Sequence, residues 1–343
     1  MFELSEINFI QSYMVRLSPY AGEPIVSNFD IDADDEISLT FIEKTISNFI
    51  VSNDMKYASF ITEDGKNSKA YSLLLELSEN LSYLKTCANE IAEEYFKLIA
   101  DNDKVLSGDL IITLFEMEDC PYFGFFKYNH KTMLMTNLVQ NKGANNLSIV
   151  EISSLITSSR HKADEGFVLN FKTFELILID KKYEINSQME YIYKDTILLL
   201  DTEHSQKEKF DIFNKVTKNI EKKYLLQDPE KTANLKKAVK DSADEDGKIL
   251  VEEVVDNAFD KTSDMNGIYK DALTRSGIDM REKIEVKEPV MKNKFQRQKI
   301  KTETGIEINI PVDYYEDKSK VEFIPDEDGT ISILIKNIKN LSI

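Results

Sequence analysis

The spacing of apolar residues changes at about residue 109, and this change restricts the folds that the 343-residue chain can form. Before it, apolar side chains recur at alternating intervals of three and four, which is the heptad spacing of a long amphipathic helix. These side chains are Leu74, Leu77, Leu81, Leu84, Ala88, Ile91, Tyr95 and Leu98. After it, residues 110–117, 122–128 and 131–139 have the composition of strands with short connections, which predicts an antiparallel meander.

The heptad-spaced helix has two interpretations. Its apolar seam can pair with a second helix in a coiled coil, or it can pack on a sheet as a core helix. Strands flank the helix in the sequence, and they favour packing on a sheet. The seam therefore leaves a homodimer open without requiring one.

Further elements are predicted on both sides of this helix. Strands are expected at residues 7–17, 25–29, 166–179, 196–200, 306–310, 321–324 and 331–335. A helix that Asp34 or Asp35 can cap extends to Ile50, and turns are expected at Asp64-Gly65 and at residues 325–329. Helices and an antiparallel sheet in separate runs predict the α+β fold class.

Two domains are expected, with a boundary at about residue 203. The N-terminal domain, residues 1–203, would hold an antiparallel sheet and long amphipathic helices. The C-terminal domain, residues 204–343, would hold a lysine-rich helical segment that closes with a small antiparallel sheet.

A cluster of basic residues stands out against a formal net charge of -18. Residues 290–301 contain no acid, and their cations are Lys292, Lys294, Arg297, Lys299 and Lys301. A basic segment in so acidic a chain indicates an anionic partner, of which nucleic acid is the clearest candidate. A solvated linker that carries lysines for solubility is the alternative. Phe295, within the segment, is expected to pack beneath it rather than to wedge between bases.

A second basic region extends from Lys207 to Lys240, where ten lysines stand against five acids. The apolar face of its helix is expected to consist of Phe210, Phe213, Ile220 and Tyr224. The opposite face is expected to carry Lys215, Lys218 and Lys222. Because acids repel DNA at long range, DNA binding by such a chain requires the acids to lie away from these basic segments.

The sequence lacks the marks of several other classes of protein. It opens with an acidic segment and contains no apolar run near the ~18 residues of a membrane helix, so a cytoplasmic protein without membrane contact is expected. Cys87 and Cys120 form no C-x-x-C pair, which fits a reducing compartment. The histidines His130, His161 and His204 have no companion at metal-ligand spacing.

Catalytic motifs are also missing. The serines Ser153, Ser154, Ser158 and Ser159, next to Arg160, have no nucleophile elbow around them and are expected to form a loop. No glycine-rich phosphate loop occurs in the sequence. We therefore expect no enzyme, no cofactor and no metal.

One segment partly matches a calcium-binding loop. Asp244, Asp246, Gly247 and Glu253 fall at the third, fifth, sixth and twelfth positions of such a loop. The first position, normally Asp, is Ser242, which removes a charged ligand. An acidic turn between helices, with a new helix starting at Leu250, is the favoured interpretation.

Several segments resemble a known family. Residues 304–310 (Thr-Gly-Ile-Glu-Ile-Asn-Ile), the strand 321–324, the turn 328–330 and the strand 331–333 look like its C-terminal strand and closing hairpin. Residues 122–126, 169–171 and the helix 210–224 are similar too, in the same order. The chain thus resembles the 37-kilodalton nucleoid-associated bacterial protein family, the NdpA-like proteins. The resemblance implies a cytoplasmic protein of the nucleoid that binds double-stranded DNA without being an enzyme.

The leading hypothesis is a non-enzymatic protein that binds double-stranded DNA through phosphate contacts with little sequence specificity. The cations named above, in residues 290–301 and on the helix, would make these contacts. The alternative is an acidic interaction protein whose N-terminal domain docks a basic partner, such as another nucleoid protein, and which does not bind DNA itself.

Overall fold

The computed structural model describes residues 6–61, 68–141, 144–152, 161–225, 229–244, 246–286, 295, 297–302, 304–314, 317–326 and 330–338. The chain divides into two compact units, Met1–Ser205 and Gln206–Ile343, each with its own hydrophobic core. The fold is mixed α+β with an antiparallel main sheet, which confirms the predicted class.

The unit Met1–Ser205 is built on an eight-stranded sheet in the order β12-β3-β9-β8-β5-β4-β1-β2. Every neighbouring pair of strands is antiparallel. The strands are β1 (Asn8–Leu17), β2 (Ile25–Val26), β3 (Lys56–Phe60), β4 (Gly108–Met117), β5 (Cys120–Asn129), β8 (Glu165–Asn170), β9 (Leu176–Ile179) and β12 (Leu200–Thr202).

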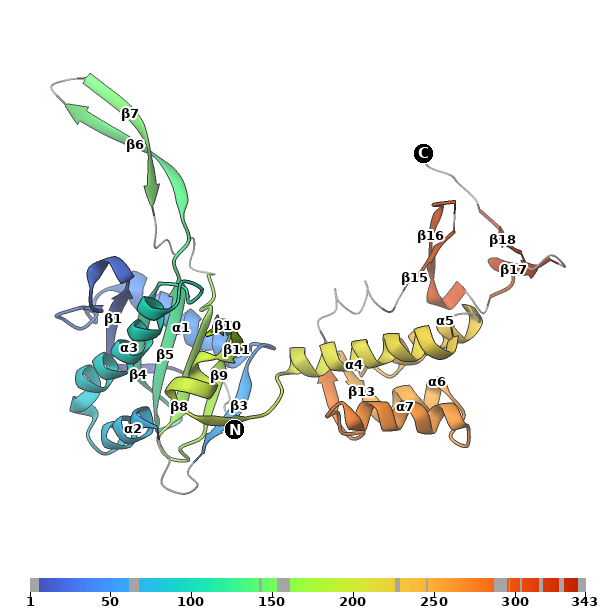
Figure 1. Cartoon of the computed structure of the whole chain (residues 1–343), viewed down its shortest axis with the longest axis horizontal. Coiled ribbons are helices and arrows are strands. Elements are labelled where there is room, and N and C mark those ends of the chain that lie inside the picture. Colours follow the sequence, from blue (N-terminus) through green and yellow to red (C-terminus); the bar gives the residue numbers. More distant parts are fainter. Residues whose placement is uncertain are drawn as a thin grey trace. The chain divides into compact units, whose positions relative to one another are not determined.

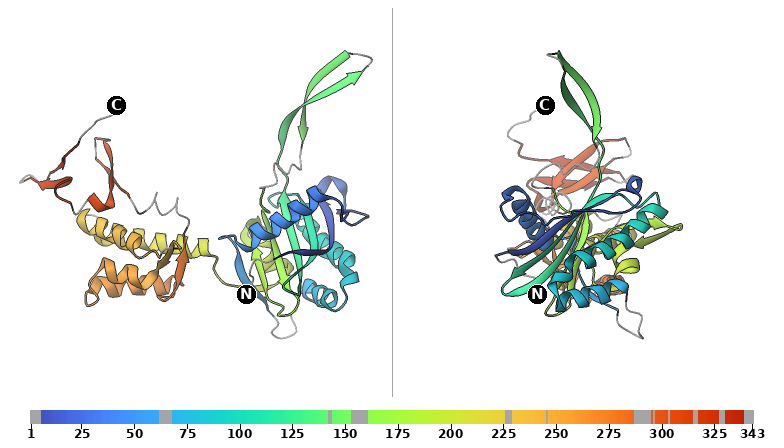
Figure 2. Two further views of the ribbon diagram at one scale, coloured as in Figure 1. Left: turned by 180° about the vertical axis from the view of Figure 1, so that it is seen from behind. Right: turned by 90° about the vertical axis from the view of Figure 1, so that its left-hand side faces the viewer.

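Helices cover both faces of this sheet (Figure 1; Figure 2, right). On one face, α1 (Glu36–Ile50) packs against Ile111 and Phe115 of β4. On the other, α2 (Lys69–Glu79) and α3 (Leu84–Asp101) pack against Ile112 and Leu114 of the same strand. Side chains on the two sides of β4 therefore enter separate cores, as the two-residue period of a strand requires.

The heptad-spaced segment is a core element, but it is not one continuous helix. It breaks at Asn80, whose backbone is extended (φ -140°, ψ 93°) and whose side chain accepts from the Ser82 N–H at 3.2 Å. The short helix η3 (Leu81–Tyr83) then leads into α3. The apolar side chains of the seam lie buried or partly buried in the core on the sheet, so they are not available to a coiled-coil partner.

The prediction of a three-stranded meander is wrong in its last strand. The strands β4 and β5 pair as expected, but β6 (Met133–Asn141) leaves the sheet and pairs with β7 (Ala144–Ile152) in a separate two-stranded ribbon. Figure 1 and Figure 2 show this ribbon extending away from the sheet of its unit. A strand pattern indicates the conformation of a segment but does not fix its pairing partner.

The end of this unit consists of a small hairpin and a wide helical turn. The strands β10 (Lys182–Ile185) and β11 (Gln188–Tyr191) pair with each other, and the π-helix η4 (Ile192–Ile197) follows. The strand expected at 196–200 is thus displaced to β12. The one expected at 166–179 is divided into β8 and β9, and the one expected at 25–29 is confined to β2.

The unit Gln206–Ile343 is mainly helical. It contains α4 (Gln206–Ile220), the π-helix η5 (Glu221–Leu225), α5 (Pro229–Asp241), α6 (Val251–Ala258) and α7 (Asp264–Arg275), with the strand pair β13 (Lys248–Leu250) and β14 (Lys283–Glu285). Phe210, Phe213 and Ile220 are buried as predicted. Tyr224 is exposed instead, because the wider turn of η5 brings Leu225 to the inner position.

Two hairpins complete this unit. The strand β15 (Arg297–Lys301) pairs with β16 (Glu307–Pro311). After η6 (Val312–Tyr314), the strand β17 (Val321–Pro325) pairs with β18 (Ile331–Ile335). The three C-terminal strands that the sequence predicted are confirmed. Ile310 and Val321 pack with Ala233 of α5, which joins both hairpins to the helices (Figure 1).

Some expected features lie outside the described residues. They are the turn Asp64-Gly65, the serines Ser153, Ser154, Ser158 and Ser159 with Arg160, and residues 327–329 of the turn 325–329. In the part of the chain that is described, no helix has both the length and the apolar composition to cross a membrane.

Candidate nucleic-acid interface

The charge of the chain is divided unequally between the two units. Residues 1–205 contain 17 Lys and Arg against 33 Asp and Glu, a net charge of -16. Residues 206–343 contain 26 against 28, a net charge of -2. Most of the net negative charge that would repel DNA therefore belongs to the first unit, whereas every cation of the predicted site belongs to the second.

The strand β15 presents three cations on one face of its hairpin. Arg297, Lys299 and Lys301 are two residues apart and exposed, so their side chains follow one another at intervals of about 7 Å on the same face. Ile300 points to the opposite face, where it packs with Ile308 in the apolar cluster that includes Ala233 of α5. Packing of the apolar face thus fixes the direction of the basic face.

A single acid of the described residues enters this basic face. Glu307 lies opposite Lys301 in the hairpin, and its carboxylate is 2.7 Å from Lys299 Nζ and 3.9 Å from Lys301 Nζ. We did not anticipate this pairing from the sequence. The turn at Gly305 (φ +90°), between two strand-like segments, was the signal that could have revealed the hairpin and hence the register.

The lysines of α4 and η5 form a second exposed group. Lys215, Lys218 and Lys222 recur at intervals of three and four, so they lie on one side of the helix, away from the buried Phe213 and Ile220. Within the described part of the chain, no acid lies within ion-pair distance of these three lysines. They are therefore free to meet phosphate groups.

Other lysines of these helices hold the unit together. Lys209 pairs with Glu282 at 2.9 Å, and Lys240 pairs with Asp313 at 2.6 Å, which ties α5 to η6. Burial lowers the pKa of Lys236, and the nearby Glu221 carboxylate opposes this effect. The structure thus separates lysines with a structural role from the exposed ones that the sequence pattern selected.

The first two cations of the basic cluster, Lys292 and Lys294, lie outside the described residues. Phe295 is described and is 3% exposed, with its ring centroid 6.2 Å from that of Phe210 in an edge-to-face contact. This confirms that Phe295 packs against the core of its unit. The same contact anchors the basic segment to α4.

The segment that resembles a calcium loop is a turn held by its own backbone. Asp244 accepts from the N–H groups of Asp246 and Lys248, at 3.1 and 2.8 Å, and its carboxylate lies 3.8 Å from Lys283 Nζ. The helix α6 begins directly after Leu250, as the sequence predicted. No group of three or more metal-ligating side chains occurs among the described residues.

Two of the histidines have separate local contacts in the first unit. His130 Nε2 is 3.2 Å from Asp109 Oδ1, while His161 Nε2 is 3.2 Å from Lys131 Nζ. Burial and Lys131 both lower the pKa of His161, which favours its neutral form. The sequence indicated no partner for either histidine, and in the structure each contacts a different side chain.

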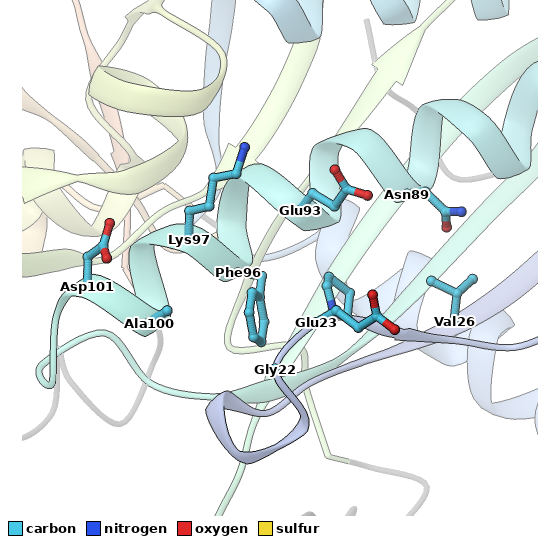
Figure 3. Close-up of a pocket in the computed structure, with 10 residues that line it drawn as sticks. Gly22, Glu23, Val26, Asn89, Glu93, Phe96, Lys97, Ala100 and Asp101 are labelled. Carbon is cyan, nitrogen blue, oxygen red and sulfur yellow. The ribbon is translucent and has the colours of Figure 1, made fainter.

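A pocket of the first unit has the opposite character to the basic faces. It lies between the loop that leads into β2 and the helix α3, and its volume is about 520 Å³ (Figure 3). Glu23, Glu93 and Asp101 line it, with Lys97 as its one basic side chain. A pocket with this excess of carboxylates disfavours phosphate and suits a cationic group.

A search of curated proteins finds no match for this chain. A protein-family model does match it, over residues 16–342, and therefore over both units and both basic groups. The chain belongs to the NA37 family, whose description is nucleoid-associated protein YejK.

Proposed function

We propose that this protein binds double-stranded DNA of the bacterial nucleoid through phosphate contacts, without catalysis and with little sequence specificity. The observation that carries the proposal is the basic face of β15, where three exposed cations at two-residue spacing meet one carboxylate. Lysine and arginine side chains in such a row neutralise phosphates one by one, and these contacts do not depend on the base sequence. The cytoplasm, where the nucleoid lies, is the proposed location.

The second basic group supports the same proposal. Lys215, Lys218 and Lys222 stand on a helix that is anchored by Phe210 and Phe213, so their backbone positions are fixed before DNA arrives. The second unit is almost neutral as a whole because its 26 cations nearly balance its 28 acids, so DNA meets less net negative charge there than at the first unit. Lys292 and Lys294 extend the proposed site by their sequence position alone.

Binding can be measured by fluorescence anisotropy of a labelled duplex across a salt series. If about five phosphates are neutralised, log K falls against log salt with a slope of about -4.5. The triple variant Arg297→Glu, Lys299→Glu, Lys301→Glu should weaken binding and flatten the slope by about 2–3, since each lost phosphate contact removes about one unit. The variant Lys215→Glu, Lys218→Glu, Lys222→Glu should act in the same direction.

A matched control distinguishes the loss of a local binding site from the effect of a changed net charge. Lys261→Glu, Arg275→Glu, Arg281→Glu changes the charge of the same unit by the same amount, at side chains that lie beside Asp256, Asp271 and Asp279. This control should retain the native slope. Equal weakening by the control and the β15 variant, or no binding by the native protein at ~50 mM salt, would refute the proposed site. An unlabelled duplex of unrelated sequence should compete as well as the labelled one.

The acidic pocket favours a second candidate function, in which the first unit docks a basic partner. A lysine-rich peptide should then bind the native protein, and Glu93→Lys should abolish that binding because it places a cation among the carboxylates of the pocket. Charge reversal on β15 should leave peptide binding unchanged. Peptide binding without DNA binding would make this candidate the better account.

A further inference from the structure

The hairpin of β15 and β16 has one face in solvent, and that face carries more than cations. Residues opposite each other in an antiparallel pair share a face, so the register places Lys299 with Asn309 and Lys301 with Glu307. Arg297, on the same side of β15, completes the set, which is called here the ribbon face. All five side chains are exposed. The cations therefore stand on β15, whereas β16 supplies an amide and a carboxylate.

The opposite face of the hairpin is packed, and this packing fixes the direction of the ribbon face. Ile300, Ile308 and Ile310 point to the packed side, where they form an apolar cluster with Ala233 of α5 and Val321 of β17. A two-stranded hairpin is marginally stable alone, and the cluster supplies the support that it needs. The ribbon face is thus a preformed surface on a packed backing, with nothing from the described residues of its unit in front of the exposed side chains.

The shape of the hairpin suits the major groove of double-stranded DNA. This groove is about 12 Å wide and admits a two-stranded ribbon, whereas the minor groove of undistorted B-DNA, about 6 Å wide, is too narrow for one. Strands of five residues are about 17 Å long, which corresponds to about five base pairs. A face of this size can therefore lie along the floor of the major groove, as the strands of several DNA-binding β-proteins do.

The chemistry of β16 points to the same groove. Asn309 carries both a donor and an acceptor, which match N7 and the N6 amino group of adenine in the major groove. In the minor groove an A·T pair shows only acceptors, so the amide oxygen of Asn309 would stay unpaired there. Phosphates repel the Glu307 carboxylate, but the N4 amino group of cytosine, which also lies in the major groove, suits it as a donor. A face for phosphates alone gives neither group a partner.

The order of side chains along the hairpin separates two kinds of contact. Asn309 and Lys299 lie at the middle of their strands, where a ribbon in the groove meets base edges. Arg297 and Lys301 lie at the two ends of β15, about 14 Å apart. Their long side chains reach the phosphates that border the groove and so set the position of the hairpin on the duplex.

We propose that the β15–β16 hairpin enters the major groove of DNA and that Asn309 recognises the N6 and N7 edge of an adenine there. Arg297 and Lys301 contact the phosphates on either side. The inference rests on the proposed DNA binding, to which it adds the groove and one base contact. Almost any mixed sequence offers an adenine within about five base pairs, so one such contact is compatible with low sequence specificity.

Three duplexes of one sequence test the groove. They contain adenine, 7-deazaadenine or 3-deazaadenine at every adenine position. The first analogue lacks the N7 acceptor of the major groove and the second lacks the N3 acceptor of the minor groove, while both keep the phosphates and the base pairing. In fluorescence anisotropy, the native protein should bind the 7-deaza duplex about 5-fold more weakly than the adenine duplex, which is the lower end of what a two-bond base contact contributes. It should bind the 3-deaza duplex with unchanged affinity.

Variants at position 309 assign the effect to this side chain. Asn309→Ala should bind the adenine duplex about 5-fold more weakly and should no longer distinguish it from the 7-deaza duplex. Asn309→Gln should keep part of the distinction, because glutamine presents the same two groups to adenine. Asn28→Ala, at an exposed asparagine of the first unit, is the matched control and should behave as the native protein. The slope of log K against log salt should be the same for all of them, since no phosphate contact is lost.

The outcomes distinguish a failure of this inference from a failure of the proposed function. Equal, salt-dependent binding of the adenine and 7-deaza duplexes would overturn the major-groove contact and leave phosphate binding in place. Weaker binding of the 3-deaza duplex alone, or an Asn309→Ala variant that still distinguishes the 7-deaza duplex, would do the same. Absence of binding to all three duplexes at ~50 mM salt would overturn both proposals.

Discussion

Replacing Lys127 by methionine is expected to destabilise the unit Met1–Ser205 by about 3–5 kcal/mol, because it leaves a carboxylate buried without its cation. Lys127 of β5 and Glu165 of β8 are opposite each other in the central sheet, and both side chains are 0% exposed. Lys127 Nζ lies 2.8 Å from Glu165 Oε1 and donates to Asn129 Oδ1 at 2.6 Å. After the change, the Tyr183 hydroxyl, at 2.6 Å, is the remaining hydrogen-bond donor to Glu165 within the described structure.

The size of this loss of stability follows from the Glu165 carboxylate that stays buried after Lys127 is replaced. The methionine fills most of the volume of the lysine chain, so little of the loss comes from a cavity. The uncompensated charge of Glu165 dominates, because burial disfavours the charged form of a carboxyl group. For a unit of this length the loss corresponds to a fall of about 6–20 °C in the midpoint of its thermal transition.

Differential scanning calorimetry of the full chain is the suitable assay, since the protein contains no tryptophan to report unfolding by fluorescence. A second variant, Lys127→Met with Glu165→Gln, removes both charges and keeps an acceptor for Tyr183. It should recover most of the lost stability. A shift below about 2 °C in the single variant, or a double variant no better than the single one, would refute the reasoning.

Further predictions concern the two units separately. Thr45 of α1 and Thr217 of α4 each donate to a backbone oxygen one turn earlier and lie 2.6 Å from a buried tyrosine hydroxyl, that of Tyr128 or Tyr269. Tyr128→Phe should therefore destabilise only the first unit, and Tyr269→Phe only the second, each by about 1 kcal/mol of unfolding free energy. Each variant should lower the midpoint of only one thermal transition, and a shift of both transitions by either variant would contradict two independent cores. Burial raises the pKa of Asp180 from 3.8 to about 7, so its contribution to stability is present below pH 4 and is lost as pH rises to 7. Asp180→Asn should raise the melting temperature at pH 8 and change it little at pH 4, and a similar shift at both pH values would count against this pKa.

The sequence predicted which side chains are buried better than it predicted where helices break and how strands pair. The seam from Leu74 to Leu98 lies in the core as expected, because apolar periodicity reports which side of a helix avoids water. The break at Asn80 was not predicted, since an asparagine that caps a helix is locally similar to one within it. Tyr224 was misplaced for a related reason: the π-turn η5 shifts the helical register by one residue, and apolar spacing alone does not reveal it.

The candidate basic site also has features that the sequence predicted and others that it did not. Charge clustering selected Arg297, Lys299 and Lys301 as candidates, and the structure places them on one face of β15. Their pairing with Glu307 depends on the register of β15 and β16, which a turn and long-range packing set together. The departure of β6 from the main sheet is also a matter of pairing, because its residues have the same strand character as those of β4 and β5.

The division of net charge between the units gives the proposed DNA binding a physical basis. A protein with its net negative charge spread evenly would repel DNA everywhere, but this chain keeps a net charge of -16 in residues 1–205 and -2 in residues 206–343, because 26 of its 43 cations lie in the second range. The second unit can then contact phosphates while the first resists them at low salt, where screening is weak. The proposed DNA contact therefore uses surfaces of the second unit, and a charge change on the first unit should leave it intact.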